Sequence, residues 1–166
     1  MRYVDRQDAG ERLADLLEGR VASGALLLAL PRGGVPVAAV IAQRLGLEVD
    51  VMLVRKLGVP GHEELAMGAI ATGGIEVLNH ELVAQLGISP AAIERVKQKE
   101  AQEIARRERA YRGSRPMPQL AGREVVLVDD GLATGATMRA AVLALRQHRP
   151  RRIVVAVPVA PPDTVQ

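Results

Sequence analysis

The chain has 166 residues, a formal net charge of +3 and no cysteine. This length suits one domain with a sizeable core, and the absence of cysteine excludes disulfide bonds and thiolate metal sites. Its apolar runs are far shorter than the roughly 20 residues needed to cross a bilayer, and with only two aromatic residues it has almost no stacking platforms for nucleic-acid bases. We therefore expect neither a membrane nor a nucleic acid as a partner, and we expect a cytoplasmic location.

The first part of the chain alternates helices with an apolar strand. An amphipathic helix is predicted over Asp8–Arg20, a buried strand over Ala25–Leu30 and a second helix over Val35–Leu45. The turn Pro31–Gly34, which contains Arg32, Gly33 and Gly34, joins that strand to the second helix. Strand, glycine loop and helix in this order favour a parallel crossover, so we predict a parallel sheet.

A third apolar segment, Val49–Val54, is predicted as a strand that ends at Arg55 and Lys56. The segment Leu57–Glu64 that follows is polar and contains glycine and proline. This composition is typical of a long exposed loop, and long loops in compact domains are usually functional or disordered.

A β-hairpin and two helices are predicted next. The hairpin strands are Ala66–Ala71 and Ile75–Asn79, and the helices cover His80–Leu86 and Pro90–Arg112. The second helix interleaves Arg and Lys with Glu, which is typical of a solvated face with i,i+4 ion pairs. An RNA-binding helix is the less favoured alternative.

The strongest local signal is the segment Val125–Met138, which reads VVLVDDGLATGATM. Its apolar run Val125–Val128 predicts a strand covered on both faces, and Asp129 and Asp130 follow directly. Small residues and hydroxyls then lead into a helix that is predicted to continue to Gln147. The N–H groups of such a turn and the positive end of the helix dipole suit a phosphate, and two acids beside them suit the hydroxyls of a ribose. Alternatively, the acids only cap the helix.

Other sites are not indicated. A Walker loop needs a lysine before its Ser or Thr, whereas Ala136 precedes Thr137. The histidines His62, His80 and His148 are dispersed, so no metal site built by the protein is expected. A last buried strand is predicted over Arg152–Val159.

The segment Val125–Met138 resembles the signature of the type I phosphoribosyltransferases, which is an apolar strand, two acids, a short loop and Thr-Gly-x-Thr. The resemblance implies an α/β fold, with a central and mainly parallel β-sheet flanked by helices and with a β-hairpin lid. It implies transfer of ribose 5-phosphate from phosphoribosyl pyrophosphate (PRPP) to a nucleobase-like acceptor with release of pyrophosphate. Mg²⁺ would be held mainly by the substrate. We expect residues 1–166 to form a single domain of this kind.

The resemblance also suggests roles for individual residues. Those that would bind PRPP are Asp129, Asp130, Gly131, Ala133, Thr134, Gly135, Ala136 and Thr137, the two acids also being catalytic. Those that would bind pyrophosphate are Arg32, Gly33, Gly34, Arg55 and Lys56. On spacing alone, the Gly-Gly turn could be an ordinary connection and the two cations could simply solvate the end of a strand.

The identity of the catalytic acid is a separate question. Hypoxanthine-guanine enzymes of the family carry an acid where this chain has Ala133, and that acid handles the N7 proton of the purine. Adenine enzymes have alanine there, and their Arg-Lys and Pro-Gly segment before the mobile loop is similar to RKLGVPGHEE in this chain. The acid would then be Glu63 or Glu64, unless these are only solvated loop residues.

The chain departs from the family at Gln166, where family members continue to a loop that helps hold the nucleobase. This leaves open a chain truncated at its C-terminus, a degenerate paralogue or a site completed by a partner subunit. We expect a homo-oligomer. A catalytically silent regulator that senses PRPP or binds nucleic acid on the same fold is the alternative function.

Overall fold

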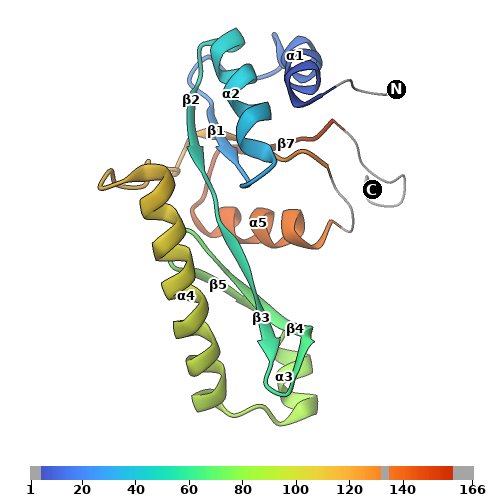
Figure 1. Ribbon diagram of the computed structural model, residues 1–166, viewed down its shortest axis with the longest axis vertical. Coiled ribbons are helices and arrows are strands. Elements are labelled where there is room, and N and C mark those ends of the chain that lie inside the picture. Colours follow the sequence, from blue (N-terminus) through green and yellow to red (C-terminus); the bar gives the residue numbers. More distant parts are fainter. Residues whose placement is uncertain (1–4, 132–134, 159–166) are drawn as a thin grey trace.

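The computed structural model describes residues 5–131 and 135–158. These residues form two β-sheets and the helices around them (Figure 1). The elements in chain order are α1 (Arg6–Leu17), β1 (Leu26–Ala29), α2 (Gly34–Leu45), β2 (Glu48–Val51), β3 (Val54–Val59), β4 (His62–Ala71), β5 (Ile75–Leu78), α3 (His80–Leu86), α4 (Pro90–Arg112), β6 (Glu124–Val128), α5 (Ala136–Gln147) and β7 (Arg152–Ala156).

The first sheet has four parallel strands in the order β2-β1-β6-β7. Alternate residues of its central strands point to opposite faces. On β1, Leu27 and Ala29 pack against α1 and α2, whereas Leu26 and Leu28 pack in the cluster that contains α5. Both faces are therefore covered by helices, which explains the continuous apolar runs of β1 and β6 (Figure 1).

The second sheet has three antiparallel strands in the order β3-β4-β5 and lies below α5 in Figure 1. Leu57 of β3 and Met67 of β4 share a buried cluster with Ile104 of α4. On the other side, α5 contacts all three strands. Helix α5 thus lies between the two sheets and belongs to the core of both.

The expected α/β class is confirmed, and so are several element boundaries. Helices α3 and α4 match their predicted ranges because both ends of each carry clear signals: Asn79 and Ser89 cap the first turns, and Gly87 and Gly113 follow the last ones. No helix within residues 5–131 and 135–158 is long and apolar enough to cross a membrane.

The expected loop over Leu57–Glu64 was wrong. Strand β3 continues to Val59, the chain turns at Pro60 and Gly61, and β4 begins at His62. The alternation of Leu57 and Val59 buries both side chains against α4, so these two residues gain more from a strand than from a loop. Because β3 begins at Val54, Arg55 and Lys56 also lie within a strand and not beyond the end of one.

Candidate active site

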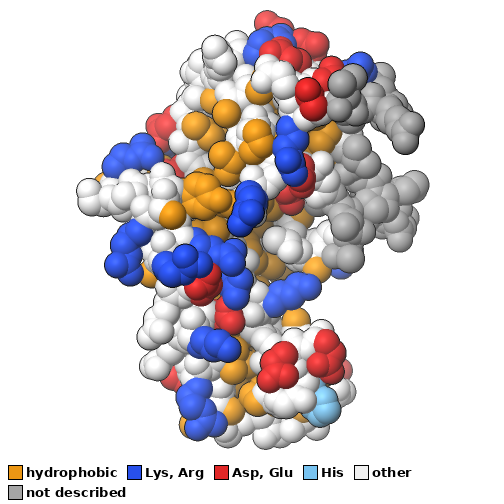
Figure 2. All heavy atoms as spheres, viewed as in Figure 1, with side chains coloured by type: hydrophobic (Ala, Val, Ile, Leu, Met, Phe, Trp, Pro, Cys, Tyr) orange, Lys and Arg blue, Asp and Glu red, His pale blue; other side chains and the backbone are white. Residues whose placement is uncertain are grey.

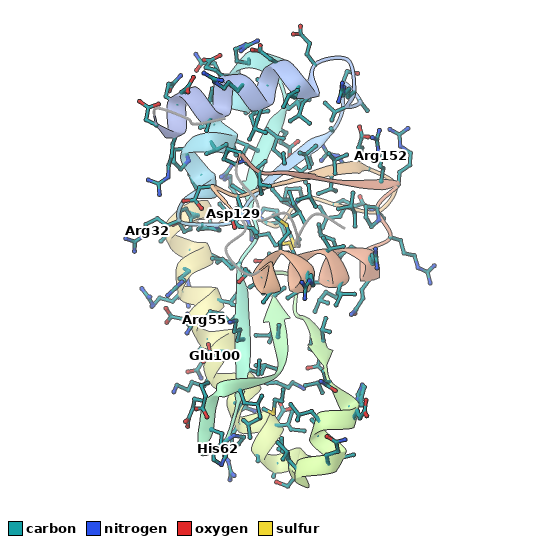
Figure 3. The ribbon with its side chains drawn as sticks, turned by 90° about the vertical axis from the view of Figure 1, so that its right-hand side faces the viewer. Arg32, Arg55, His62, Glu100, Asp129 and Arg152 are labelled. Carbon is teal, nitrogen blue, oxygen red and sulfur yellow. The ribbon has the colours of Figure 1, made fainter. Side chains whose placement is uncertain are left out.

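The acid pair and the first glycine loop meet at the carboxyl ends of two neighbouring strands. Asp129 follows β6 directly, and the loop Pro31–Gly33 follows β1 after Leu30. The backbone N–H of Leu30 donates to the carbonyl oxygen of Val128 at 2.8 Å, which extends the pairing of β1 and β6 to this edge. Ligands of parallel sheets collect at such an edge. Arg32 and Asp129 lie at the same level of the molecule in Figure 3.

Two glycines allow the loop to pack directly against the acids. A Cβ atom on Gly33 would lie 2.8 Å from Oδ1 of Asp130 and closer still to the other atoms of that carboxylate. A Cβ atom on Gly34 would overlap the carbonyl oxygen of Val128 and lie 3.1 Å from Cα of Asp129. Any larger residue would separate the two segments, so the loop and the acid pair form one continuous surface only because both residues are glycine.

The two acids differ in environment. Asp129 is half-buried and Asp130 is exposed, and the backbone N–H of Asp130 donates to Oδ1 of Asp129 at 2.8 Å. Burial is the main cause that raises the pKa of Asp129 to about 6, and the neighbouring Asp130 side chain raises it further against the lowering effect of that N–H. Asp129 therefore changes charge in the mildly acidic range.

Helix α5 begins beside the acid pair in the sequence. Its N-cap is Gly135, which has a φ of 76° and no side chain that could occupy the N–H groups of the first turn. Gly131 is half-buried, and Ala136 and Thr137 are exposed in the first turn. Ala133 and Thr134 lie outside the described residues. The N–H groups and the positive dipole end at the start of a helix are a common place for anions to bind.

Arg55 and Lys56 do not point to the same place. Arg55 donates through Nε to Glu100 of α4 at 2.7 Å, and the two side chains are neighbours in Figure 3. Lys56 lines a groove of about 340 Å³ on the other side of β3, together with Ala136 and Arg139 of α5. Successive strand residues face opposite ways, so only Lys56 lies near the start of α5.

Glu63 and Glu64 lie near the tip of the β3–β4 hairpin, and both are exposed. Their neighbour His62 lies near the lower end of the molecule in Figure 3, well below the level of Asp129. Oε1 of Glu64 is 3.8 Å from Nδ1 of His62. The structure thus does not bring these carboxylates to the acid pair.

Two residues at the site, Arg6 and Arg139, were missed by sequence reasoning. Nη2 of Arg6, the first residue of α1, lies 3.0 Å from Oδ2 of Asp130. The two residues are 124 positions apart, and nothing in the local pattern around Arg6 indicates the contact. Arg139 was missed as well, although its position in the first turn of the predicted helix was a usable signal.

Comparison with known proteins agrees with this arrangement. A model of the phosphoribosyl transferase domain matches residues 6–166. Two Mycobacterium tuberculosis proteins, each named "putative phosphoribosyl transferase", are 45% identical over 163 residues. The alignment covers 98% of this chain and 37% of each relative, so the chain spans little more than a third of the length of these curated relatives.

Solved structures agree as well. A crystal structure from Thermus thermophilus has a TM-score of 0.86 and 46% identity, with 99% of this chain and 78% of that chain covered. A purine phosphoribosyltransferase from Pyrococcus horikoshii has a TM-score of 0.56 at 16% identity, with 100% and 79% covered, which shows a shared fold. The chain belongs to the phosphoribosyl transferase domain family. The expected type I phosphoribosyltransferase class is therefore confirmed.

Proposed function

We propose that this chain binds PRPP at the carboxyl ends of β1 and β6 and transfers its ribose 5-phosphate to a nucleobase-like acceptor, releasing pyrophosphate. The observation that carries the proposal is the direct packing of Gly33 on Asp130 and of Gly34 on Val128 and Asp129. Pyrophosphate and ribose are adjacent groups of PRPP, and here the loop proposed for one touches the acids proposed for the other.

Each part of the site has a role in this proposal. Asp129 and Asp130 accept hydrogen bonds from the ribose hydroxyls, which favours their ionised forms. The 5′-phosphate lies against the first turn of α5, between Gly131 and Thr137. Arg32 and the glycine loop hold the pyrophosphate. Lys56 adds a positive charge at the start of α5, and Arg55 joins the site only if it leaves Glu100.

The reaction itself is a displacement at C1 of the ribose. A ring nitrogen of the acceptor forms a bond to C1 while the bond from C1 to the pyrophosphate oxygen breaks, and pyrophosphate leaves with the electron pair. The nitrogen loses its proton to a carboxylate, for which Glu63 and Glu64 are our candidates. Because these residues lie far from Asp129, the hairpin would have to close over the bound substrate and exclude water.

The family pairs PRPP with Mg²⁺, and the residues present fit a metal held mainly by the substrate. Carboxylate oxygens such as those of Asp129 and Asp130 are ligands that Mg²⁺ accepts. Across residues 5–131 and 135–158, no three His, Asp or Glu side chains gather closely enough to hold a metal ion, so PRPP oxygens would complete the coordination. When bound, the ion would neutralise negative charge on the departing pyrophosphate.

The silent regulator remains a second candidate, favoured by the distance of Glu63 and Glu64 from the acids and by the engagement of Arg55 with Glu100. The nucleic-acid version of this candidate gains less support. Lys and Arg side chains gather over α4 with Asp and Glu between them (Figure 2), and Arg106, Arg107 and Arg112 all form ion pairs. A cytoplasmic location and a homo-oligomer stay predictions.

Calorimetric titration with PRPP and Mg²⁺ tests the binding site, and release of pyrophosphate with a panel of nucleobases tests transfer. We expect wild-type binding, its loss in an Asp129→Asn/Asp130→Asn variant, and unchanged binding after the exposed Glu81→Gln substitution. A Thr134→Glu variant, which places an anion where the 5′-phosphate should bind, is also expected to lose binding. Undiminished PRPP binding by a folded Asp129→Asn/Asp130→Asn variant would refute the proposed PRPP site. Wild-type binding of PRPP without transfer to any nucleobase would favour the silent regulator.

A further inference from the structure

The guanidinium of Arg6 lies where the proposed ribose and pyrophosphate sites meet. Its Nη2 atom is 3.0 Å from Oδ2 of Asp130, and the same carboxylate packs against Gly33 of the first loop. A cation from α1 therefore reaches the junction between the loop after β1 and the acids after β6. None of the roles proposed above involves this helix.

Helix α1, which carries Arg6, is packed tightly against α2. Gly10 packs so closely on α2 that a Cβ atom there would lie 3.0 Å from Cγ1 of Val40 and closer still to its Cβ. Arg44 of α2 pairs with Glu11 at 2.5 Å and with Asp15 at 2.7 Å. The helix is thus anchored along its length, and only the side chain of Arg6 has to move to change partners.

The position of Arg6 is poor for the helix itself. The first turn of a helix favours negative side chains, and the N-cap Asp5 and Asp8 fit this rule, whereas a cation at the first residue opposes the helix dipole. The contact with Asp130 also brings little stability, because the side chains are 58% and 41% exposed. An arginine at this place is better explained by a ligand than by folding.

We propose that Arg6 is a pyrophosphate-binding residue that exchanges partners when PRPP binds. In the free protein its guanidinium pairs with Asp130. The diphosphate carries more negative charge than one carboxylate and offers oxygens that match the guanidinium fork, so Arg6 transfers to it and frees Asp130 for the ribose hydroxyls. This inference rests on the proposed PRPP site, and it adds a ligand contact from α1 to that site.

The test compares two ligands in four proteins. Calorimetry measures binding of PRPP and of ribose 5-phosphate, each with Mg²⁺, to the wild type, Arg6→Gln, Arg6→Lys and the control Arg12→Gln. The control removes the same charge from the same helix, at a residue that pairs with Asp8 at 3.2 Å. Thermal unfolding of each protein is followed in parallel, because a merely structural role of Arg6 would lower its midpoint.

We expect Arg6→Gln to weaken PRPP binding by on the order of tenfold to a hundredfold, as for loss of a hydrogen bond to a charged group. Arg6→Lys should lose less, because it keeps the charge without the fork. The Arg12→Gln variant should bind PRPP with wild-type affinity. The affinity for ribose 5-phosphate, which lacks the pyrophosphate, should not fall in any variant. The unfolding midpoint of Arg6→Gln should be unchanged or slightly higher.

Four results would overturn the inference. Equal weakening of both ligands in Arg6→Gln would show that Arg6 does not contact pyrophosphate, and a lower unfolding midpoint with proportionate losses would indicate a structural role. Unchanged PRPP affinity in Arg6→Gln, with normal wild-type binding, would refute this inference alone. If the wild type binds neither ligand, the proposed function fails and the inference falls with it.

Discussion

At the scale of single residues, the charge of Asp129 is the feature of the site that depends on pH. Burial is the largest cause that raises its pKa to about 6, and the side chain of Asp130 adds to the increase. The folded state holds this proton more tightly than an unfolded chain would, because the ordinary pKa of the carboxyl is 3.8. The contribution of Asp129 to the free energy of unfolding is therefore present at low pH and is lost as the pH rises from 3.8 to about 6.

An Asp130→Asn substitution should lower the pKa of Asp129 without returning it to the ordinary value. The substitution removes the negative neighbour but leaves the burial and keeps the backbone N–H of residue 130 as a donor. Carboxyl carbon NMR across an acid titration measures the midpoint directly. A midpoint identical to that of the wild type would show that the Asp130 charge does not act on Asp129.

Gly33 should not accept even a methyl group without a loss of stability. A Cβ atom at this position would overlap the Asp130 carboxylate, so Gly33→Ala must push the loop or the acid aside. We expect a loss of about 1–3 kcal/mol in urea unfolding, as for other overpacked sites, together with weaker PRPP binding.

Gly24→Ala is the matched control, because nothing lies within 4 Å of a Cβ atom there. This control should leave both quantities unchanged. An equal stability in the Gly33 and Gly24 variants would mean that the close packing of the loop on Asp130 is not maintained in solution.

At the scale of elements, closure of the β3–β4 hairpin separates the two candidate functions, because only the enzyme needs Glu63 or Glu64 at the substrate. If the hairpin closes and delivers Glu63 or Glu64, a Glu63→Gln/Glu64→Gln variant should lower turnover by about 10²–10⁴, the usual contribution of general acid–base help. PRPP affinity should stay close to that of the wild type, because the acids and the glycine loop lie on other elements. Unchanged turnover in this double variant would remove both glutamates from the mechanism.

The elements also show how far the sequence could be interpreted. The β6–α5 unit was predictable because a continuous apolar run, two acids and a glycine-rich turn leave few alternatives to strand, loop and helix. The β3–β4 hairpin was not, because Gly58, Pro60 and Gly61 indicate a loop when the segment is considered alone. Its strands form through pairing and through burial of Leu57 and Val59 against α4, a helix more than 30 positions away in the sequence.

Contacts between distant segments set the same limit at the site. The Arg6–Asp130 pair depends on how α1 packs and leaves no trace in local spacing. The separation of Arg55 from Lys56 follows from strand alternation, but only once β3 is known to run through both residues. The acids and glycines themselves were accessible from sequence, because a phosphate site built from backbone N–H groups needs glycines and a helix start close together.

At the scale of the whole molecule, a buried ion pair connects the antiparallel part to the parallel sheet. Arg112, in the last turn of α4, donates to Asp50 of β2 at 2.6 Å and to the carbonyl oxygen of Val51 at 2.9 Å. The two charged side chains are only 5% and 7% exposed. Removal of one partner would leave the other charge buried and uncompensated.

An Arg112→Met variant should therefore lose about 3–5 kcal/mol in urea unfolding. The control Arg109→Met removes an exposed arginine of the same helix and should change little. Both proteins should unfold in one transition if residues 1–166 form a single domain. A loss of stability well below this range in Arg112→Met would mean that water reaches the ion pair. Two separate unfolding transitions would indicate that the chain consists of two domains.

Helix α5 contacts both sheets, and this shared position makes binding and hairpin opening reciprocal. Val54 of β3 and Ile75 of β5 pack against its buried cluster, while its first turn lies beside the proposed phosphate site. We expect PRPP to bind more tightly to the state in which α5 is packed against the antiparallel sheet. By thermodynamic linkage, PRPP then raises the free energy needed to separate α5 from that sheet by the same amount by which this packing strengthens PRPP binding. Saturating PRPP should then slow amide hydrogen exchange in β5, a strand to which no ligand contact is assigned. Equal exchange rates in β5 with and without PRPP would show that the two sheets respond independently.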